Sequence, residues 1–248
     1  MLRGLYTAAT GMVVQEMRQE TISNNLNNAN TPGYKRDEPL LKSFPETLLW
    51  QIGNGQKQLI GGLPSGSMVD QVVTEHDPGI VERTGRPLDM ALEGDGYFSL
   101  ETPNGIRYSR NGHFQRTKDG YLVNEMGFYA LGSSGRIKLS SEDITVDEHG
   151  KISINGQMVD ELDIRSFDNP ETLLKEGNAL FKASDNTRET TDASINVLQK
   201  SLEKSNVNLV KEMVNMMNVV RTYESNQKVI QAYDRVMEMS AKEIGSLR

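Results

Sequence analysis

The sequence has no cysteine among its 248 residues, which excludes disulfides, thiolate metal sites and cysteine nucleophiles. It also lacks any apolar run near the ~18 residues that a membrane-spanning helix needs. Its first 33 residues contain no apolar segment followed by a small-residue cleavage site. We therefore expect no membrane insertion and no cleavable signal peptide, so any route out of the cytoplasm has to be a different one.

Aromatic residues are scarce, at 6% of the chain, and eleven of the fifteen lie between residues 37 and 198. We expect the hydrophobic core in that region, because aromatic side chains bury the most apolar surface. Charge is also uneven: residues 1–36 and 199–248 each carry +2, so the total of −7 leaves −11 for the middle. An acidic middle offers no basic face, and we expect no nucleic-acid partner.

Residues that would carry chemistry are isolated. His76, His113 and His149 have no second histidine at metal-ligand spacing, and we interpret all three as surface or turn residues. The segment Gly94-Asp95-Gly96 is a fragment of a dinucleotide-binding motif, but a strand-like Tyr-Phe-Ser-Leu follows it where the motif requires a helix. We therefore expect no catalytic residue, no cofactor and no metal site.

The end of the chain predicts one long helix over residues 205–244, where there is no proline or glycine. At 1.5 Å per residue it would be roughly 55 Å long. One stripe with spacings of three and four contains Met213, Met216, Val220, Tyr223, Ile230, Met237, Ala241 and Ile244, with polar Gln227 and Asp234 at two of its positions. A second stripe contains Val210, Met217, Val229, Tyr233 and Val236. An isolated helix is marginal in water, so this one needs partners.

Residues 2–28 predict a second helix. Its apolar face contains Leu5, Ala9, Met12, Ile22 and Leu26, and polar residues at positions 15, 16 and 19 interrupt it. Two incomplete stripes at opposite ends of one chain can complete each other by pairing as a coiled coil, either parallel or antiparallel.

The end of this helix and the residues after it are rich in asparagine, with Asn24, Asn25, Asn27, Asn28 and Asn30 close together. Asparagine is a weak helix former because its amide competes for backbone groups. The next residues, Pro32-Gly33, suit the two central positions of a type II turn. We expect the helix to end here in a polar, hydrogen-bonded turn.

The middle of the chain has two parts. Residues 34–66 contain Pro39, Pro45, Pro64 and many glycines, and predict an irregular connector with a short amphipathic helix at residues 44–52. From residue 67 to 168, short apolar or aromatic runs alternate with glycines seven to nine residues apart, which is typical of short antiparallel strands.

The expected fold class is therefore α+β, with long N- and C-terminal helices paired as a coiled coil and a central antiparallel, sandwich-like or barrel-like β domain. We expect a discontinuous helical domain (residues 1–33 and 203–248), a connector (34–66) and a β-rich domain with a return linker (67–202).

Residues 23–35, Ser-Asn-Asn-Leu-Asn-Asn-Ala-Asn-Thr-Pro-Gly-Tyr-Lys, resemble the N-terminal signature of the flagellar axial proteins, which comprise the rod, hook and hook-associated families, and depart from it at Asn27, where alanine is usual. Residues 1–12, 84–89, 94–98, 110–114, 205–213 and 221–228 resemble motifs of the basal-body rod proteins within this group. The resemblance covers most of the chain and is weakest between about residues 36 and 66.

This resemblance implies a structural subunit of the flagellar rod and not an enzyme. Such a subunit would polymerise through its terminal helices into the drive shaft that transmits torque and surrounds the export channel. Its partners would be copies of itself, other rod and hook proteins, and the flagellar type III export apparatus. It would lie in the basal body, outside the cytoplasm.

The assembly interface that we expect comprises Leu5, Met12, Leu26, Asn24, Asn25, Asn28, Asn30, Met213, Met216, Val220, Tyr223, Ile230, Tyr233 and Met237. The methionines suit an interface between non-identical neighbours because thioethers adapt their shape. Packing within one subunit is the alternative for each of these residues. Two other functions stay open at this point: a soluble coiled-coil adaptor that forms a closed oligomer, and a cell-wall hydrolase.

Overall fold

The computed structural model describes residues 2–45, 47–53, 56–63, 66–141, 143–177, 179–184, 187–190 and 195–246. The chain forms two compact units. The first, here called the helical unit, comprises Met1–Leu26, Asp37–Val73 and Leu209–Arg248. The second, the β unit, comprises Asn27–Arg36 and Thr74–Asn208.

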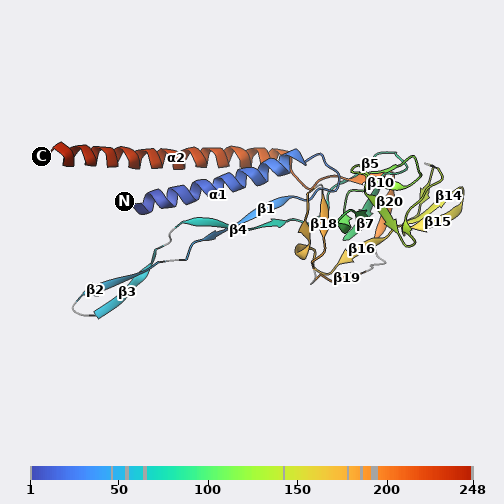
Figure 1. Cartoon of the computed structure of the whole chain (residues 1–248), viewed down its shortest axis with the longest axis horizontal. Helices are drawn as coiled ribbons and strands as arrows, with labels where there is room; N and C mark the ends of the chain where they lie inside the picture. Colours follow the sequence, from blue (N-terminus) through green and yellow to red (C-terminus); the bar gives the residue numbers. More distant parts are fainter. Residues whose placement is uncertain are drawn as a thin grey trace. The chain divides into compact units, whose positions relative to one another are not determined.

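Two helices dominate the helical unit: α1 (Leu2–Asn27) and α2 (Leu209–Ser246), which has 38 residues. They lie side by side (Figure 1). The helices predicted at residues 2–28 and 205–244 are thus confirmed to within a few residues at each end. Among the described residues, neither helix combines the length and the hydrophobicity that crossing a membrane requires.

Two pairs of strands complete the helical unit. Strand β1 (Asp37–Ser43) pairs with β4 (Ser67–Thr74), and β2 (Thr47–Gly53) forms an antiparallel hairpin with β3 (Gln56–Leu63). The expectation of an irregular segment with a short helix at residues 44–52 was therefore wrong where the segment is described; residues 46, 54, 55, 64 and 65 lie outside the described residues. Pairing with β3 gives the backbone of residues 47–53 the hydrogen bonds that a helix would have supplied internally.

The β unit is built from short strands. In chain order they are β5 (Val81–Arg83), β6 (Met90–Glu93), β7 (Gly96–Thr102), β8 (Gly105–Ser109), β9 (Phe114–Arg116), β10 (Leu122–Asn124), β11 (Tyr129–Gly132), β12 (Gly135–Arg136), β13 (Thr145–Val146), β14 (Lys151–Ile154), β15 (Gln157–Glu161), β16 (Ile164–Phe167), β17 (Leu174–Lys175), β18 (Leu180–Lys182), β19 (Glu189–Thr190), β20 (Asn196–Gln199) and β21 (Ser201–Glu203). A single 3₁₀ turn, η1 (Pro170–Thr172), interrupts the described strands.

The largest sheet has the order β17-β18-β8-β7-β11-β10-β9, with β16 also on β7. Strand β14 pairs with β13 and β15, while β20 pairs with β6 and β21 with β5. The pairings for which a register is described are antiparallel. A tight turn at residues 103 and 104 joins β7 to β8, and Gly105, the first residue of β8, has φ of +101°. Strands β20 and β21, the last of the chain, thus pair with β6 and β5, the first two strands of this unit.

The core of the β unit lies on both faces of β7, because successive side chains of a strand point to opposite sides. Phe98 and Leu100 join the main cluster of buried apolar residues, whereas Tyr97 packs with Phe167 and Phe181 on the other face. Burial on both faces explains why residues 96–100 are all buried. The predicted fold class, paired terminal helices around a central antiparallel β domain, is confirmed, and the β domain is a half-barrel.

Candidate assembly interface

The two helices pack through matching faces. Seven positions on α1 that are at least partly buried follow spacings of four and three: Gly4, Ala8, Gly11, Gln15, Arg18, Ile22 and Asn25. Seven positions on α2 do the same: Glu212, Met216, Val219, Tyr223, Asn226, Ile230 and Tyr233. This spacing is that of a coiled-coil seam, which we call the internal seam.

The seam runs antiparallel. A Cβ added at Gly4 would overlap the Tyr233 hydroxyl, and one added at Gly11 would lie 3.0 Å from Nδ2 of Asn226. Because position 4 meets 233 and position 11 meets 226, residue numbers fall along one helix as they rise along the other. In this register α1 has no residue opposite the last turns of α2, beyond about residue 236.

The internal seam is only partly apolar. Val219 and Ile22 are buried in it, but so are Glu212 and Asn25. The Oε1 atom of Gln15 is buried without a hydrogen-bond partner among the described residues. Because buried polar groups add little stability unless they are fully hydrogen-bonded, this seam alone holds the helices weakly.

Asn25 has a defined role at the end of the seam. Its Nδ2 donates to the carbonyl of Asp37 at 2.8 Å, and its Oδ1 accepts from the Asp37 N–H at 3.0 Å. One buried amide thus satisfies both backbone groups of the first residue of β1, which fixes where the strand starts against the helix.

The structure divides the expected interface residues into two groups. Those that are buried or half-buried within the subunit are Leu5, Met12, Asn25, Leu26, Asn28, Met216, Tyr223, Ile230 and Tyr233. Those that are exposed are Asn24, Asn30, Met213, Val220 and Met237. The stripe proposed from sequence therefore shares three positions with the internal seam and otherwise lies on its flank; the side chain of Ile244 lies outside the described residues.

A second apolar face lies on the first three turns of α2, away from the internal seam. It contains Val210, Met213, Val214, Met217 and Val220, and we call it the outer face. These side chains are strongly exposed, from 38% for Val220 to 71% for Val210. Their spacing, i, i+3, i+4, i+7 and i+10, places them on one side of the helix. Exposed apolar patches of this kind are typical of surfaces that contact another protein, a membrane or a ligand.

The asparagine-rich segment ends α1 as predicted. The Thr31 N–H donates to the Asn28 carbonyl, and the Tyr34 N–H donates to the Thr31 carbonyl across Pro32-Gly33. Gly33 has φ of +67°, the value that the third position of a type II turn needs. The turn at Pro32-Gly33 is thus confirmed. A Cβ at Gly33 would overlap the backbone of Arg110 and Asn111, so glycine is also required for close packing.

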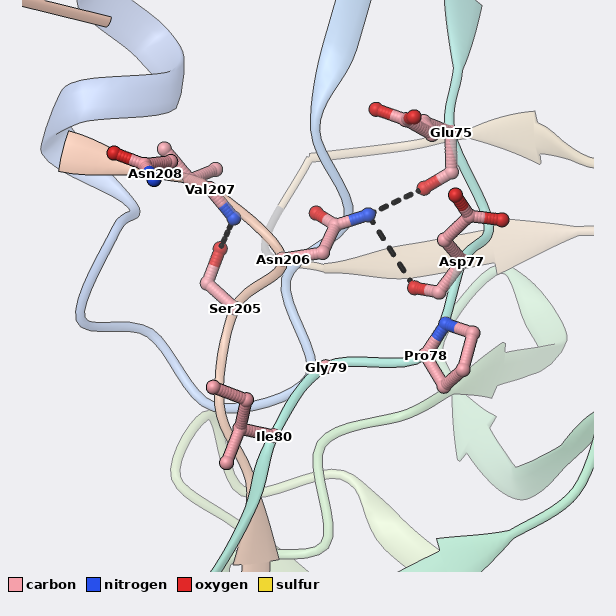
Figure 2. Close-up of a pocket in the computed structure, with 9 residues that line it drawn as sticks. All are labelled: Glu75, Asp77, Pro78, Gly79, Ile80, Ser205, Asn206, Val207 and Asn208. Atoms are coloured by element: carbon pink, nitrogen blue, oxygen red, sulfur yellow. Dashed lines mark hydrogen bonds between the residues drawn. The ribbon is translucent and has the colours of Figure 1, made fainter. Parts of the chain in front are cut away.

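Beyond this turn, three segments of the β unit meet in a polar junction: residues 33–36, 75–80 and 203–206. Asn206 links all three. Its Nδ2 donates to the Glu75 carbonyl at 2.9 Å (Figure 2). Its Oδ1 accepts from the Arg36 N–H at 2.8 Å. The Glu75 N–H in turn donates to the Arg36 carbonyl at 2.8 Å. Arg36, Glu75 and Asn206 therefore close a ring of hydrogen bonds.

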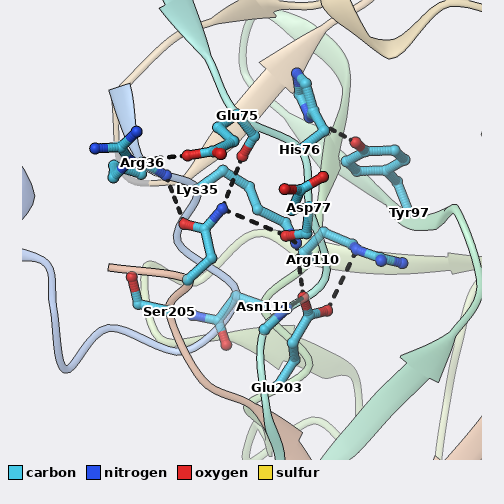
Figure 3. Close-up of polar contacts among 12 residues, drawn as sticks. Lys35, Arg36, Glu75, His76, Asp77, Tyr97, Arg110, Asn111, Glu203 and Ser205 are labelled. Atoms are coloured by element: carbon cyan, nitrogen blue, oxygen red, sulfur yellow. Dashed lines mark hydrogen bonds and ion pairs between the residues drawn. The ribbon is translucent and has the colours of Figure 1, made fainter. Parts of the chain in front are cut away.

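A cluster of buried charges, formed by Lys35, Arg110 and Glu203, adjoins this ring (Figure 3). Lys35 Nζ is 2.7 Å from Glu203 Oε1, and each side chain is only 1% exposed. Arg110 Nε is 3.3 Å from the other Glu203 oxygen. Burial lowers the pKa of Lys35 and the charge of Glu203 acts against this shift. Two cations thus share one buried carboxylate.

The buried charges are tied to the backbone as well. Lys35 Nζ donates to the Asp77 carbonyl at 2.8 Å, and the Gly79 N–H donates to Glu203 Oε1 at 2.8 Å. Arg110 Nη1 donates to the carbonyls of Gly94 and Gly96, and its guanidinium lies over the Tyr97 ring. The cluster is therefore anchored to the start of β7 in the core sheet.

A pocket of about 370 Å³ opens beside the junction, lined by Glu75, Asp77, Pro78, Gly79, Ile80, Ser205, Asn206, Val207 and Asn208 (Figure 2). Within the part of the chain that is described, no group of three or more histidine, aspartate or glutamate side chains could hold a metal ion. The Ser205 hydroxyl accepts from the Val207 N–H, and Asn206 is already engaged in the ring. The Ser205 and Asn206 side chains are therefore engaged in hydrogen bonds with backbone groups.

The interpretation of all three histidines as surface or turn residues was wrong for two of them. His76 lies against Phe181, and its Nδ1 is 2.8 Å from the Tyr97 hydroxyl. His113 Nδ1 is 2.8 Å from the buried carboxylate of Asp89. Sequence spacing missed these contacts because the hydrogen-bond partners are 21 and 24 positions away in the chain. His149 is exposed, as expected.

Known proteins were compared with the chain. Three family descriptions match it: "Flagella basal body rod protein" over residues 5–35, "Flagellar hook protein FlgE/F/G D1 domain" over 91–154, and "Flagellar basal body rod FlgEFG protein C-terminal" over 198–243. The chain is 32% identical to the flagellar hook-basal body complex protein FlhO of Bacillus subtilis (strain 168), with 100% of each chain covered.

The chain belongs to the flagellar basal-body rod protein family. It is also 31% identical to the rod protein FlgG of the same Bacillus subtilis strain (96% of this chain, 97% of the relative) and 32% identical to FlgG of Buchnera aphidicola subsp. Acyrthosiphon pisum (96% and 98%). As a rod protein it is structural and not an enzyme. The matched segments of this rod protein contain α1 with its turn, part of the β unit, and most of α2.

Proposed function

We propose that this rod protein polymerises through its terminal helices, with copies of itself and with other rod and hook proteins. The resulting drive shaft transmits torque and surrounds the export channel. In this proposal the subunit leaves the cytoplasm through the flagellar type III export apparatus. Residues 1–33 and 203–248 form the assembly domain, 34–66 the connector and 67–202 the central β domain.

The observation that carries this proposal is the outer face of α2. Fully burying a valine or methionine side chain contributes roughly 1.5–3 kcal/mol, so five such side chains make a strong driving force for association. The internal seam does not use them, because they lie away from α1. The exposed interface residues Met213 and Val220 belong to this face, and Tyr6, Val13 and Met17 on α1 are also exposed. A neighbouring helix of another subunit is the partner that fits an apolar helical stripe.

A pair of matched substitutions tests the proposal. Met217 on the outer face and Met126 in the β unit are almost equally exposed, at 53% and 54%. We expect Met217→Asp to abolish rod assembly and swimming, because it places a charge in a buried contact between subunits. We expect Met126→Asp to swim normally. Both purified variants should keep the parent's unfolding free energy within about 1 kcal/mol, because the side chains are exposed. Normal swimming of Met217→Asp would contradict the proposal.

Light scattering of the purified subunit separates this proposal from a closed coiled-coil oligomer. A closed oligomer reaches a fixed mass as concentration rises, whereas head-to-tail contacts grow into tubes or fibres. We expect continued growth for the parent protein and none for Met217→Asp. A plateau at the mass of a dimer or trimer would favour the adaptor.

A further inference from the structure

The chain passes between its two units four times. The passages lie at residues 26/27, 36/37, 73/74 and 208/209, where the ranges of the two units meet. Three of the four lie within three residues of the ring formed by Arg36, Glu75 and Asn206. Three of the four covalent connections between the helical unit and the β unit therefore run into one place.

The ring holds these three passages together inside the β unit. Arg36 precedes the second passage directly, Glu75 follows the third by two residues, and Asn206 lies three residues before α2 begins. Besides its hydrogen bonds to the other two, Arg36 donates from Nε to Glu75 Oε2 at 2.8 Å. A pull on any one passage is thus shared by the other two.

The buried charges fix the ring to the core. Lys35 adjoins Arg36 in the chain and Glu203 lies three residues before Asn206, so each holds the segment that carries a ring member. Arg110 completes the path, because it pairs with Glu203 and donates to the carbonyls of Gly94 and Gly96 at the start of β7. The backbone repeats this link: the Gly33 N–H donates to the Glu203 carbonyl at 2.8 Å.

Stability alone does not explain charges at this position. Replacing a buried ion pair with apolar side chains of similar volume is often neutral or stabilising. Apolar contacts are non-directional, however, and allow segments to slide, whereas hydrogen-bonded charges hold one arrangement. The polar junction holds three passages of the chain. Directional hydrogen bonds keep these segments from sliding past one another when torque acts on them.

We propose that Lys35, Arg110 and Glu203 are positioning residues that carry torque between the helical unit and the β unit. They act through the ring of Arg36, Glu75 and Asn206, which holds the chain where it passes between the units. This inference rests on the proposed function, because it assigns the path of the torque that the rod transmits.

The test is Glu203→Gln in the full chain, expressed in cells that lack their own copy. Glutamine keeps an oxygen for the Gly79 N–H but leaves Lys35 and Arg110 without a counter-charge. The matched control is Glu101→Gln, which removes an exposed carboxylate paired with Arg136 in the same unit. The readouts are the number of rods per cell in micrographs and the swimming speed in media of increasing viscosity.

We expect Glu203→Gln cells to assemble rods and to swim in thin medium, but to lose speed several-fold in viscous medium, where Glu101→Gln cells still match the parent. Normal speed of Glu203→Gln cells at every viscosity would overturn the inference. A lower number of rods per cell, with normal swimming speed of the cells that have rods, would also overturn the inference, because that is the effect expected of a less stable subunit.

If Glu203→Gln fails to fold, Asn206→Ala gives the same test without leaving a buried charge unpaired. It removes the hydrogen bonds that join residue 206 to Arg36 and Glu75, and we expect the same loss of speed under load. Equal speed of Asn206→Ala cells and the parent at high viscosity would overturn the inference. The proposed function fails separately, if cells without the protein still swim.

Discussion

The β unit buries a large apolar core within one chain, whereas the helical unit leaves much apolar surface exposed. Eighteen buried apolar residues form the main core of the β unit. In the described part of the helical unit, the buried apolar side chains are Ala8, Val14, Ile22 and Val219, while ten large apolar side chains of α2 alone are exposed. Because apolar burial is the main favourable contribution to folding, we expect the β unit to be stable by itself and the helical unit to depend on neighbouring subunits.

The largest effect is expected from a cavity in the β unit. Phe98 is 1% exposed and packs edge-to-face on Phe114, with ring centroids 5.3 Å apart. We expect Phe98→Ala to lower the unfolding free energy by about 3–5 kcal/mol in urea denaturation, through lost burial and the cavity left behind. As a control, Ile106→Ala removes a half-exposed side chain from the same sheet and should change it by about 0.5 kcal/mol or less. Equal changes in unfolding free energy for the two variants would mean that burial in this core is not the main source of the β unit's stability.

An intermediate effect is expected in the internal seam. Gly4→Ala raises helix propensity, but the new methyl group overlaps the Tyr233 hydroxyl. We expect the overlap to dominate and to destabilise the helix pair by about 1–3 kcal/mol, measured as lost helical circular dichroism on heating. The β unit should unfold as before.

Two further variants sharpen this prediction. Tyr233→Ala should relieve the overlap, so the double variant should recover the helix content lost in Gly4→Ala. Gly11→Ala meets only the flexible end of Asn226 and should be neutral or slightly stabilising. Equal loss in Gly4→Ala and Gly11→Ala would argue against the antiparallel register.

The smallest effect is expected from an exposed ion pair of the β unit. Hydrogen bonds from Arg136 lower the pKa of Glu101 below the ordinary carboxyl value. A lowered pKa means that the pair stabilises the fold above the carboxyl's ordinary pKa, and that this contribution is lost as the pH falls through the lowered value. Glu101→Gln should therefore flatten the thermal stability profile slightly in acid. A profile identical to the parent's would assign the pair no role in stability.

The sequence predicted the elements of both units better than their contacts. Long uninterrupted helical patterns located α1 and α2, and recurring glycines located β7 to β11. It did not predict β1, because Pro39 lies within that strand and proline disfavours an interior strand. In the described part of the chain β1 belongs to a two-stranded sheet with β4, and proline is tolerated in an edge strand.

The register of the internal seam could not be predicted from the sequence either. Apolarity favours Met213 and Val220, whereas the structure turns Val219 and Asn226 toward α1. The choice depends on Gly4 and Gly11, whose lack of a side chain admits Tyr233 and Asn226, and small residues carry no hydrophobic signal.

The polar junction was beyond sequence reasoning. Lys35 and Glu203 are 168 positions apart, and nothing in a single sequence pairs them. The signal that existed was Lys35 itself, a charged residue at the end of the asparagine-rich signature.

Hydrogen exchange of the purified subunit, first dilute and then polymerised, tests the central claim most directly. Amides of β7 and β8 should be protected in both states, because their core is closed within one chain. Amides of α2 should exchange rapidly in the dilute subunit and slow strongly on polymerisation. Protection of α2 in the dilute subunit equal to that of β7 would contradict the account.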